Sequence, residues 1–456
     1  MNVRELTKSV LTLPWAISMF GVQQVTNLMA SPPSNERMAG AAKAFDVVSD
    51  ATAQQLEGWL KQTYQVGNAV QRTLVDLLTL HAPQIDSSAL MRTAAELQSG
   101  PMFQALVKYG LPPVGWIDSL LVSRKDAPAV AQEFANKLYV ITLVTQVHSQ
   151  LGLHDGDATP LPDLVLKAGD VETFPRLWAI EGLGNYAGDR ALAASGDGHL
   201  ISGLLSDPSA ALLPPWSLTM LHAGIGMSFA KHVLKRLDAA SAPDAVRAAI
   251  EEFVSLCRRS SREGYAGAAL ESLGLATRTL YPNLTRLLDV HIPDVEPELH
   301  GYFWHGAGRA MYFDPMNMLP SVNAPWRAIR RLDEEAPHDL ARRNVLSGLA
   351  WALTVVNMRH PLIMETFLQH HGQLAAMNDA FVNGVTSALL MRYDTTREDA
   401  HIAPFVHHVP HDGDPLLASL WEQVITAPCE RALRDEYADL AGSRRLEQLF
   451  HDRSAQ

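Results

Sequence analysis

A glycine recurs at nearly constant spacing through the middle of the chain, and this feature restricts the fold more than any other. It stands at positions 182, 224, 264, 306, 348 and 384, so the intervals are 42, 40, 42, 42 and 36 residues. A small residue follows two positions later each time, and apolar helix-forming residues come next. Periods of this length are typical of stacked supersecondary units, and roughly 40 residues suit two helices with their loops.

We therefore predict an array of helical repeats from about Arg176 to Leu390, with each glycine at the start of a helix. A missing side chain lets two backbones approach closely, so we interpret the glycines as packing devices. The glycine-bearing helices would form the inner layer of an α/α solenoid or a closed α/α ring. Connectors such as 205–216, 289–299 and 331–339 would supply the turns and outer helices.

The rest of the chain also favours helices, because no segment shows the sustained alternation and turn signals of strands. We predict an all-α fold with four regions. They are an apolar helix at 1–30, a helical region at 38–152, the helical-repeat domain at 163–393, and a histidine-containing loop with a C-terminal helix at 394–456.

Charge and cysteine content exclude several classes of function. The formal net charge is −12 and no basic block occurs, so binding to nucleic acid is not expected. The two cysteines, Cys257 and Cys429, form no Cys-x-x-Cys pattern, so neither a disulfide framework nor a thiolate zinc site is supported. A reducing cytoplasm fits this composition.

The apolar segment at 9–22 has two interpretations. Pro14 interrupts it, no small-x-small cleavage site follows, and it is shorter than the ~20 residues that span a bilayer. It is either a helix docked on the body of the protein or an amphipathic anchor on a membrane or lipid surface. We predict a cytoplasmic protein, with peripheral membrane association through residues 1–30 as the alternative.

The order of the glycine stretches resembles that of an uncharacterised family of bacterial proteins encoded in enediyne polyketide biosynthetic clusters, known as a domain of unknown function. The matching stretches cover about residues 175–393: Glu181 to Gly184, Gly224 to Gly226, Glu263 to Tyr265, and Gly306 to Ala310 with Tyr312. The resemblance implies a link to the biosynthesis of specialised or lipid-like metabolites.

The residue before each glycine is polar in five of six cases: Glu181, Ala223, Glu263, His305, Ser347 and Asn383. Equivalent positions in equivalent repeats would bring these side chains to one cleft. Glu181, Glu263 and His305 are then candidate acid–base residues, because neighbouring buried carboxylates and imidazoles shift one another's pKa. Ser347 and Asn383 would bind the ligand. The alternative is helix N-capping or plain packing, which explains His305 least well.

The segment 300–313 is the densest aromatic run in the chain. Tyr302, Trp304 and Tyr312 could line a pocket for an apolar ligand, with Arg309 pairing an anionic group. The alternative is that the aromatic residues are core.

A second cluster contains His401, His407, His408 and His411, with Asp412 and Asp414. Prolines at 404, 410 and 415 favour a solvated loop over a metal site, and Glu365 with His370 and His371 has no recognised ligand spacing. No metal site is predicted. No phosphate-cradling loop, nucleophile elbow or dinucleotide fingerprint occurs, so no cofactor is predicted either.

Two hypotheses follow, and the sequence leaves open whether the protein is an enzyme. In the first, a helical-repeat protein binds a hydrophobic biosynthetic intermediate and performs a cofactor-free isomerisation, cyclisation or hydrolysis on it. In the second, a non-catalytic scaffold binds a partner protein on its concave face and docks on lipid through its N-terminus.

Overall fold

The computed structural model describes residues 126–145, 147, 151, 159–195, 201–314, 328, 331–332, 334–411 and 413–454. These residues are helical or irregular with no strand, so the predicted all-α class is confirmed for them. The predictions for 1–30 and for most of 38–152, up to residue 125, lie outside the described residues. Within the described part, no helix combines the length and apolar character needed to cross a membrane.

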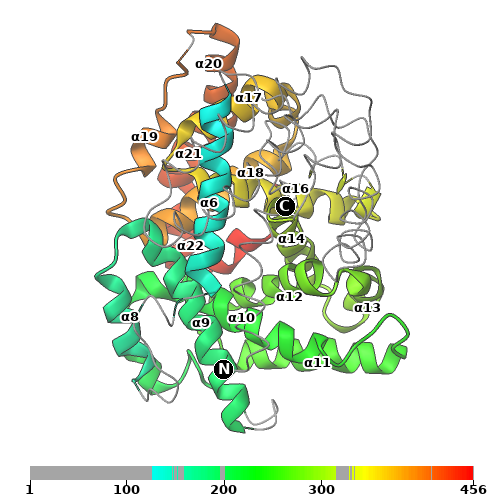
Figure 1. Cartoon of the computed structure of the whole chain (residues 1–456). Helices are drawn as coiled ribbons and strands as arrows, with labels where there is room; N and C mark the ends of the chain where they lie inside the picture. Colours follow the sequence, from blue (N-terminus) through cyan, green and yellow to red (C-terminus); the bar gives the residue numbers. More distant parts are fainter. Residues whose placement is uncertain are drawn as a thin grey trace, which may run out of the picture. The chain divides into compact units, whose positions relative to one another are not determined.

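Six helices carry the glycine pattern. They are α9 (Thr173–Ser195), α10 (Leu218–Leu234), α12 (Ala266–Leu280), α14 (Leu299–Tyr312), α16 (Asp339–Asn357) and α18 (Asp379–Thr395). Each packs against the next one in chain order, and these five contacts are the most extensive between described elements. Figure 1 shows this succession from α9 to α18. Five of the six are mostly buried, and α9 is buried through its first half, which their apolar and small residues allow.

Other helices connect and flank this series. The connecting helices are α11 (Pro243–Ser260), α13 (Thr285–Val295) and α17 (Pro361–Ala376), which lie in the chain between α10 and α12, α12 and α14, and α16 and α18. Before α9 come α6 (Ala127–Thr145) and α8 (Leu161–Gly169), and short 3₁₀ turns occupy connectors at η3 (Pro208–Leu212), η4 (Pro215–Ser217) and η5 (Pro282–Leu284).

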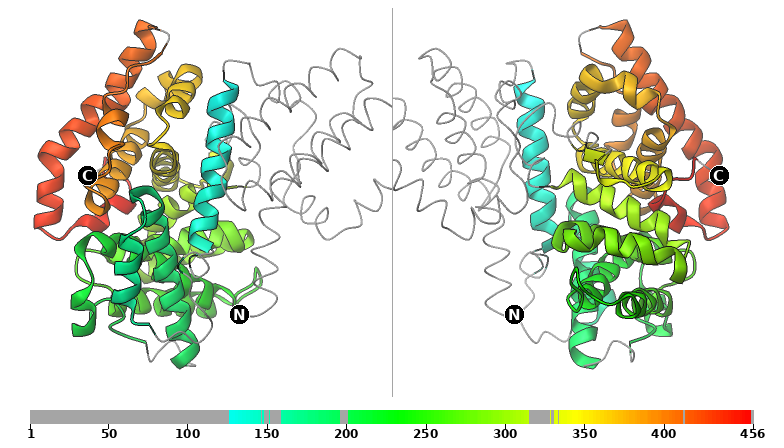
Figure 2. Two further views of the ribbon diagram at one scale, coloured as in Figure 1. Left: turned by 60° about the vertical axis from the view of Figure 1, so that its left-hand side comes forward. Right: turned by 90° about the vertical axis from the view of Figure 1, so that its right-hand side faces the viewer.

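The C-terminal part returns to the glycine-bearing helices. After α19 (Ile402–Val406), one continuous helix runs through α20 (Pro415–Trp421), η7 (Glu422–Thr426), α21 (Ala427–Arg431), η8 (Ala432–Glu436) and α22 (Tyr437–Gly442), where η7 and η8 are π-helical. Figure 2 shows it in orange and red. The final turn η9 (Leu446–Phe450) then contacts α12, α14 and α18.

Five of the six recurring glycines lie inside helices, so their predicted position at helix starts is wrong; Gly264, in the turn before α12, is the exception. A Cβ atom on Gly224 would lie 2.0 Å from the carbonyl oxygen of Glu181, and one on Gly348 would lie 1.9 Å from that of His305. Gly306 and Gly384 meet the previous helix in the same way, with 2.1 and 2.2 Å. Real Cβ atoms do not approach oxygen so closely, so these crossings require glycine.

The predicted register is also wrong at the third glycine. Gly264 lies in a turn before α12, with a φ of +87° that favours glycine, and it makes no helix crossing. The crossing position of α12 is held by Ser272, whose hydroxyl donates to the carbonyl oxygen of Ala223 over 2.9 Å. The residue before it, Glu271, therefore takes the place that the sequence assigned to Glu263.

A buried histidine on α10 makes stability depend on pH. The Nδ1–H of His222 donates to the carbonyl oxygen of Leu218 (2.6 Å), and its Nε2 accepts from the backbone N–H of Arg262 (3.0 Å). Burial lowers the pKa of His222 to about 4. Because the unfolded chain binds this proton more readily, the folded state loses stability as the pH falls through the range between about 6.5 and about 4.

We expect His222 alone to remove about 2 kcal/mol of unfolding free energy between pH 7 and pH 5. Urea denaturation at both pH values gives the unfolding free energies. The loss of unfolding free energy from pH 7 to pH 5 should be smaller by that amount in His222→Gln than in the wild type. A residual slope should persist, because burial also lowers the pKa of His360, His371 and His451 to about 4. Identical slopes for the wild type and the variant would contradict this assignment.

Candidate functional site

Four ionisable side chains from three glycine-bearing helices meet in the interior. Glu181 comes from α9, Glu271 from α12, and His305 and Arg309 from α14. None of these side chains exposes more than 7% of its surface. We call this set the buried quartet. It brings together Glu181 and His305, which the sequence singled out as acid–base residues, and Arg309, which it assigned to binding.

The quartet is one connected network. The Nδ1 of His305 lies 2.6 Å from Oε1 of Glu271, and the other oxygen of Glu271 accepts from Nη1 of Arg309. The second terminal nitrogen of Arg309 donates to Glu181 over 3.2 Å. The guanidinium therefore bridges two carboxylates that are 90 residues apart in the sequence (271 − 181). The ring of Trp351 on α16 completes the surroundings, 4.5 Å from the guanidinium.

Burial and charge act in opposite directions within the quartet. Burial raises the pKa of Glu181, although Arg309 opposes this shift. For Arg309 burial disfavours the charged form, but Glu271 and Glu181 outweigh burial and raise its pKa. The guanidinium is therefore held charged, whereas Glu181 binds a proton more readily than an exposed carboxylate does.

The quartet keeps two nitrogen atoms without a hydrogen-bond partner among the described residues. They are Nε2 of His305 and Nε of Arg309, and the neighbouring indole nitrogen of Trp351 shares this property. An unpaired buried polar group costs about 1–3 kcal/mol, so each such atom needs an explanation such as a bound ligand. A carboxylate accepts hydrogen bonds, so the contact with Glu271 requires a proton on Nδ1 of His305, and the tautomer with only that proton has its lone pair on Nε2.

Glu263 does not belong to this site, so its predicted place beside Glu181 and His305 is wrong. It lies in the turn before α12 with 75% of its side chain exposed, where it pairs with Arg444. The turn at Gly264 directs it outward, toward the C-terminal residues 444–447.

Ser347 and Asn383 form a separate buried pair on α16 and α18. The hydroxyl of Ser347 donates to Oδ1 of Asn383 over 3.3 Å, and the backbone N–H of Arg453 donates to the same oxygen. Both side chains lie well inside their helices, as do Glu181 and His305. The alternative interpretation of these residues as N-caps is therefore wrong.

The predicted aromatic binding residues point to three different neighbours. Tyr302 packs edge-on against His451, with ring centroids 5.0 Å apart. The indole of Trp304 donates to Asp289 on α13 over 2.8 Å. The hydroxyl of Tyr312 accepts from Asn357 over 2.7 Å. No hydrogen bond described for these three side chains reaches the quartet, and all three are buried.

The C-terminal residues lie beside the quartet. Phe450 packs on Trp351 with ring centroids 5.9 Å apart. The backbone N–H of Asp452 donates to Asn344 on α16 over 2.7 Å, and Arg343 on the same helix pairs with the Asp452 carboxylate. The segment 446–454 is thus fastened across the glycine-bearing helices.

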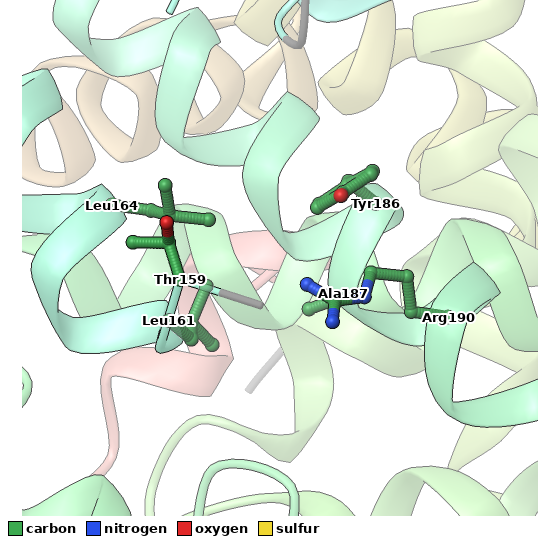
Figure 3. Close-up of a pocket in the computed structure, with 6 residues that line it drawn as sticks. All are labelled: Thr159, Leu161, Leu164, Tyr186, Ala187 and Arg190. Atoms are coloured by element: carbon green, nitrogen blue, oxygen red, sulfur yellow. The ribbon is translucent and has the colours of Figure 1, made fainter. Parts of the chain in front are cut away.

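A pocket between α8 and α9 has a volume of about 180 Å³ (Figure 3). Its lining residues are Thr159, Leu161, Leu164, Tyr186, Ala187 and Arg190. No member of the quartet lines it, and its volume is below the roughly 300 Å³ at which ligand pockets usually begin. It is not the candidate site.

Sequence reasoning missed two residues of the site, Glu271 and Trp351. A signal for Glu271 was present, because Glu271-Ser-Leu-Gly274 repeats the order of Glu181-Gly-Leu-Gly184 with one serine in place of glycine. Comparisons of the chain with protein-family models, with curated proteins and with solved structures found no match.

Proposed function

We propose that this chain binds a hydrophobic biosynthetic intermediate and catalyses a cofactor-free proton transfer on it, with His305 as the base. One observation carries the proposal. His305 is fully buried, its Nδ1 faces the carboxylate of Glu271, and its Nε2 has no partner among the described residues. A carboxylate that orients an imidazole and stabilises its protonated form is a recurring arrangement in general base catalysis.

The chemistry that fits best is an isomerisation, because it needs no second reactant. Nε2 of His305 would remove a proton from the ligand, and Glu271 would stabilise the resulting imidazolium. Glu181, whose pKa is raised, would return a proton at another atom, and the proton on His305 would then pass to Glu181 before the next turnover, so that both groups regain their starting state. Both terminal nitrogens of Arg309 donate to the two carboxylates. In this proposal Arg309 therefore positions Glu181 and Glu271, and it does not bind an anionic group of the ligand as the sequence suggested.

The proposal includes a closed α/α ring of helical repeats. It is supported by the recurrence of one crossing, in which the residue before each crossing position presents its carbonyl oxygen to the next helix. It is also supported by contacts of α18 with α10, and by the Arg392 guanidinium 5.4 Å from the ring of Phe174 on α9. The enediyne-cluster resemblance adds a specialised, lipid-like metabolite as the class of ligand.

The alternative is a non-catalytic scaffold in which the quartet only fixes the helix register. The paired terminal nitrogens of Arg309 favour it, because buried ion pairs also serve as structural registers. A partner protein or a lipid surface would then be the ligand.

The decisive experiment combines ligand detection with a matched pair of variants. We purify the protein under native conditions and denature it to release any bound ligand. Mass spectrometry should then detect an apolar small molecule. A strain that carries His305→Asn should accumulate one metabolite that the wild-type strain consumes. His300→Asn is the control, since His300 lies on the same helix but binds Asp289.

Unchanged metabolite levels in the His305→Asn strain, with the variant folded by circular dichroism, would exclude the enzyme. Where His305→Asn does not fold, Glu271→Gln tests the same step, because the amide keeps the shape of the side chain. Metabolite levels that stay unchanged in both strains would leave the scaffold as the function.

A further inference from the structure

Three side chains with metal-binding atoms converge at a second place, far from the quartet in sequence. Glu365 comes from α17, and His408 and His411 come from the segment between α19 and α20. Oε2 of Glu365 lies 2.6 Å from Nε2 of His408 and 3.0 Å from Nδ1 of His411. The fold therefore gives this segment a partner 43 and 46 residues earlier in the chain.

The histidine segment is fixed on both sides. The carbonyl oxygen of Val406 accepts from the indole of Trp421 (3.3 Å) and from the hydroxyl of Thr426 (2.8 Å). The ring of His408 packs on Trp421 with centroids 4.7 Å apart. Downstream, the side chain of Asp414 caps α20 by accepting from the N–H of Leu416. The two histidines therefore do not belong to a freely solvated loop.

The carboxylate is also oriented. The backbone N–H of His411 donates to Oε1 of Glu365 over 3.2 Å, which leaves Oε2 facing both imidazoles. A carboxylate held by a second hydrogen bond is the arrangement in which metal-binding carboxylates are usually found.

We propose that Glu365, His408 and His411 bind Zn²⁺ or a similar borderline divalent cation. Tetrahedral zinc with bonds of roughly 2.0–2.1 Å separates its ligand atoms by about 3.3 Å, so the oxygen–nitrogen distances to His408 (2.6 Å) and His411 (3.0 Å) need to widen by about 0.7 and about 0.3 Å. The side chain of His411 is 67% exposed, which gives it room to move and leaves a fourth position open to water. Two imidazoles disfavour Mg²⁺ and Ca²⁺, which prefer oxygen ligands.

A second carboxylate–histidine cluster differs from the one at Glu365, because a backbone contact fixes which nitrogen of one histidine carries the proton. Asp289 accepts from His300, from His338 and from the indole of Trp304. Nδ1 of His338 accepts the backbone N–H of Ala341 at the start of α16, so its Nε2 carries the proton and donates to Asp289. A cation at that nitrogen would displace this proton, so the cluster at Asp289 is explained without a metal.

Calorimetric titration of the full, chelator-treated chain with Zn²⁺ alone tests the proposal. We expect one tight site in the wild type and an affinity lowered by more than about 100-fold in His408→Ala and in Glu365→Gln. His407→Ala and His338→Ala are the matched controls, and both should keep the wild-type affinity. His407 lies next to the site in sequence, and His338 belongs to the cluster at Asp289. Co²⁺ in place of Zn²⁺ should give the visible absorption band of a four- or five-coordinate site.

His411→Ala keeps the test decisive should the buried ligands prove necessary for folding, because an exposed histidine is removed at little cost in stability. The variant should lose the tight site while remaining folded. Absence of tight Zn²⁺ binding in the wild type, or wild-type affinity in His411→Ala, would overturn the proposal. Loss of binding in His338→Ala with retention in His411→Ala would place the metal at Asp289 and overturn it equally.

Discussion

Replacing Arg309 by methionine should lower the free energy of unfolding by about 3–5 kcal/mol, the usual cost of removing one partner from a buried ion pair. The reason lies in the two carboxylates that Arg309 bridges. Glu181 and Glu271 would remain buried without their cation, and each would have to bind a proton or stay as an unpaired charge. Methionine keeps the contact with Trp351, so the measured loss reports on charge more than on volume.

Urea denaturation at neutral pH measures the effect. The control is Arg444→Met, which removes an exposed partner from Glu263 and should change stability by less than about 1 kcal/mol. Equal stability of the two variants would refute the ion-pair argument.

A triple variant separates the structural role of the quartet from its proposed chemistry. Glu181→Gln and Glu271→Gln combined with Arg309→Met remove all of the opposed charges, so most of the stability lost in Arg309→Met should return. A folded triple variant that still consumes the metabolite would show that the charges serve the fold alone. A folded variant without turnover would assign them to the reaction.

The helical class and the importance of the glycines could be predicted from sequence, but the place of the glycines within the helices could not. Glycine costs about 1 kcal/mol relative to alanine inside a helix, so pattern reasoning moves it toward a helix end. The crossing of Gly348 with the backbone of His305 overrides this preference, because only glycine allows that approach. Helix propensity describes the preference of a residue within one helix, whereas the packing of two helices decides which residue is allowed at this position.

The crossing position on α12 was missed for a related reason. A near-constant spacing pointed to Gly264, but the connectors differ in length: α11 has 18 residues and α13 has 11. The crossing at Ser272 therefore lies later in the chain than the glycine spacing predicts. The hydroxyl of Ser272 donates a hydrogen bond to the carbonyl oxygen of Ala223, which a glycine could not do. A search for equivalent stretches that allowed serine would have found Glu271 in place of Glu263.

The cluster at Glu365 could not be predicted from the histidine segment, because its carboxylate comes from another helix. The prolines were also misleading. Pro404 lies in the first turn of α19, where proline is tolerated because its missing N–H has no intrahelical partner. The segment therefore forms a short helix and a fixed turn, and the latter places His408 and His411 against α17.

Adding a single methyl group at Gly348 should be among the most damaging small changes in the chain. A Cβ there would lie 1.9 Å from the carbonyl oxygen of His305 and 2.8 Å from its carbonyl carbon. The obstacle is backbone, so no side-chain rotation relieves it, and α14 and α16 have to separate. We expect Gly348→Ala to lose about 3 kcal/mol or more, at the upper end of overpacking effects.

The matched control is Gly442→Ala at the end of α22, where a Cβ would meet no atom within 4 Å. Alanine restricts the unfolded chain more than glycine does, so this variant should be neutral or stabilised by up to about 1 kcal/mol. Urea denaturation gives the two values, and near-ultraviolet circular dichroism reports whether the aromatic side chains keep their environment. Similar stabilities for the two variants would mean that the helices do not cross at Gly348. The position of His305 against Glu271 depends on that crossing, so the proposed base would lose its support as well.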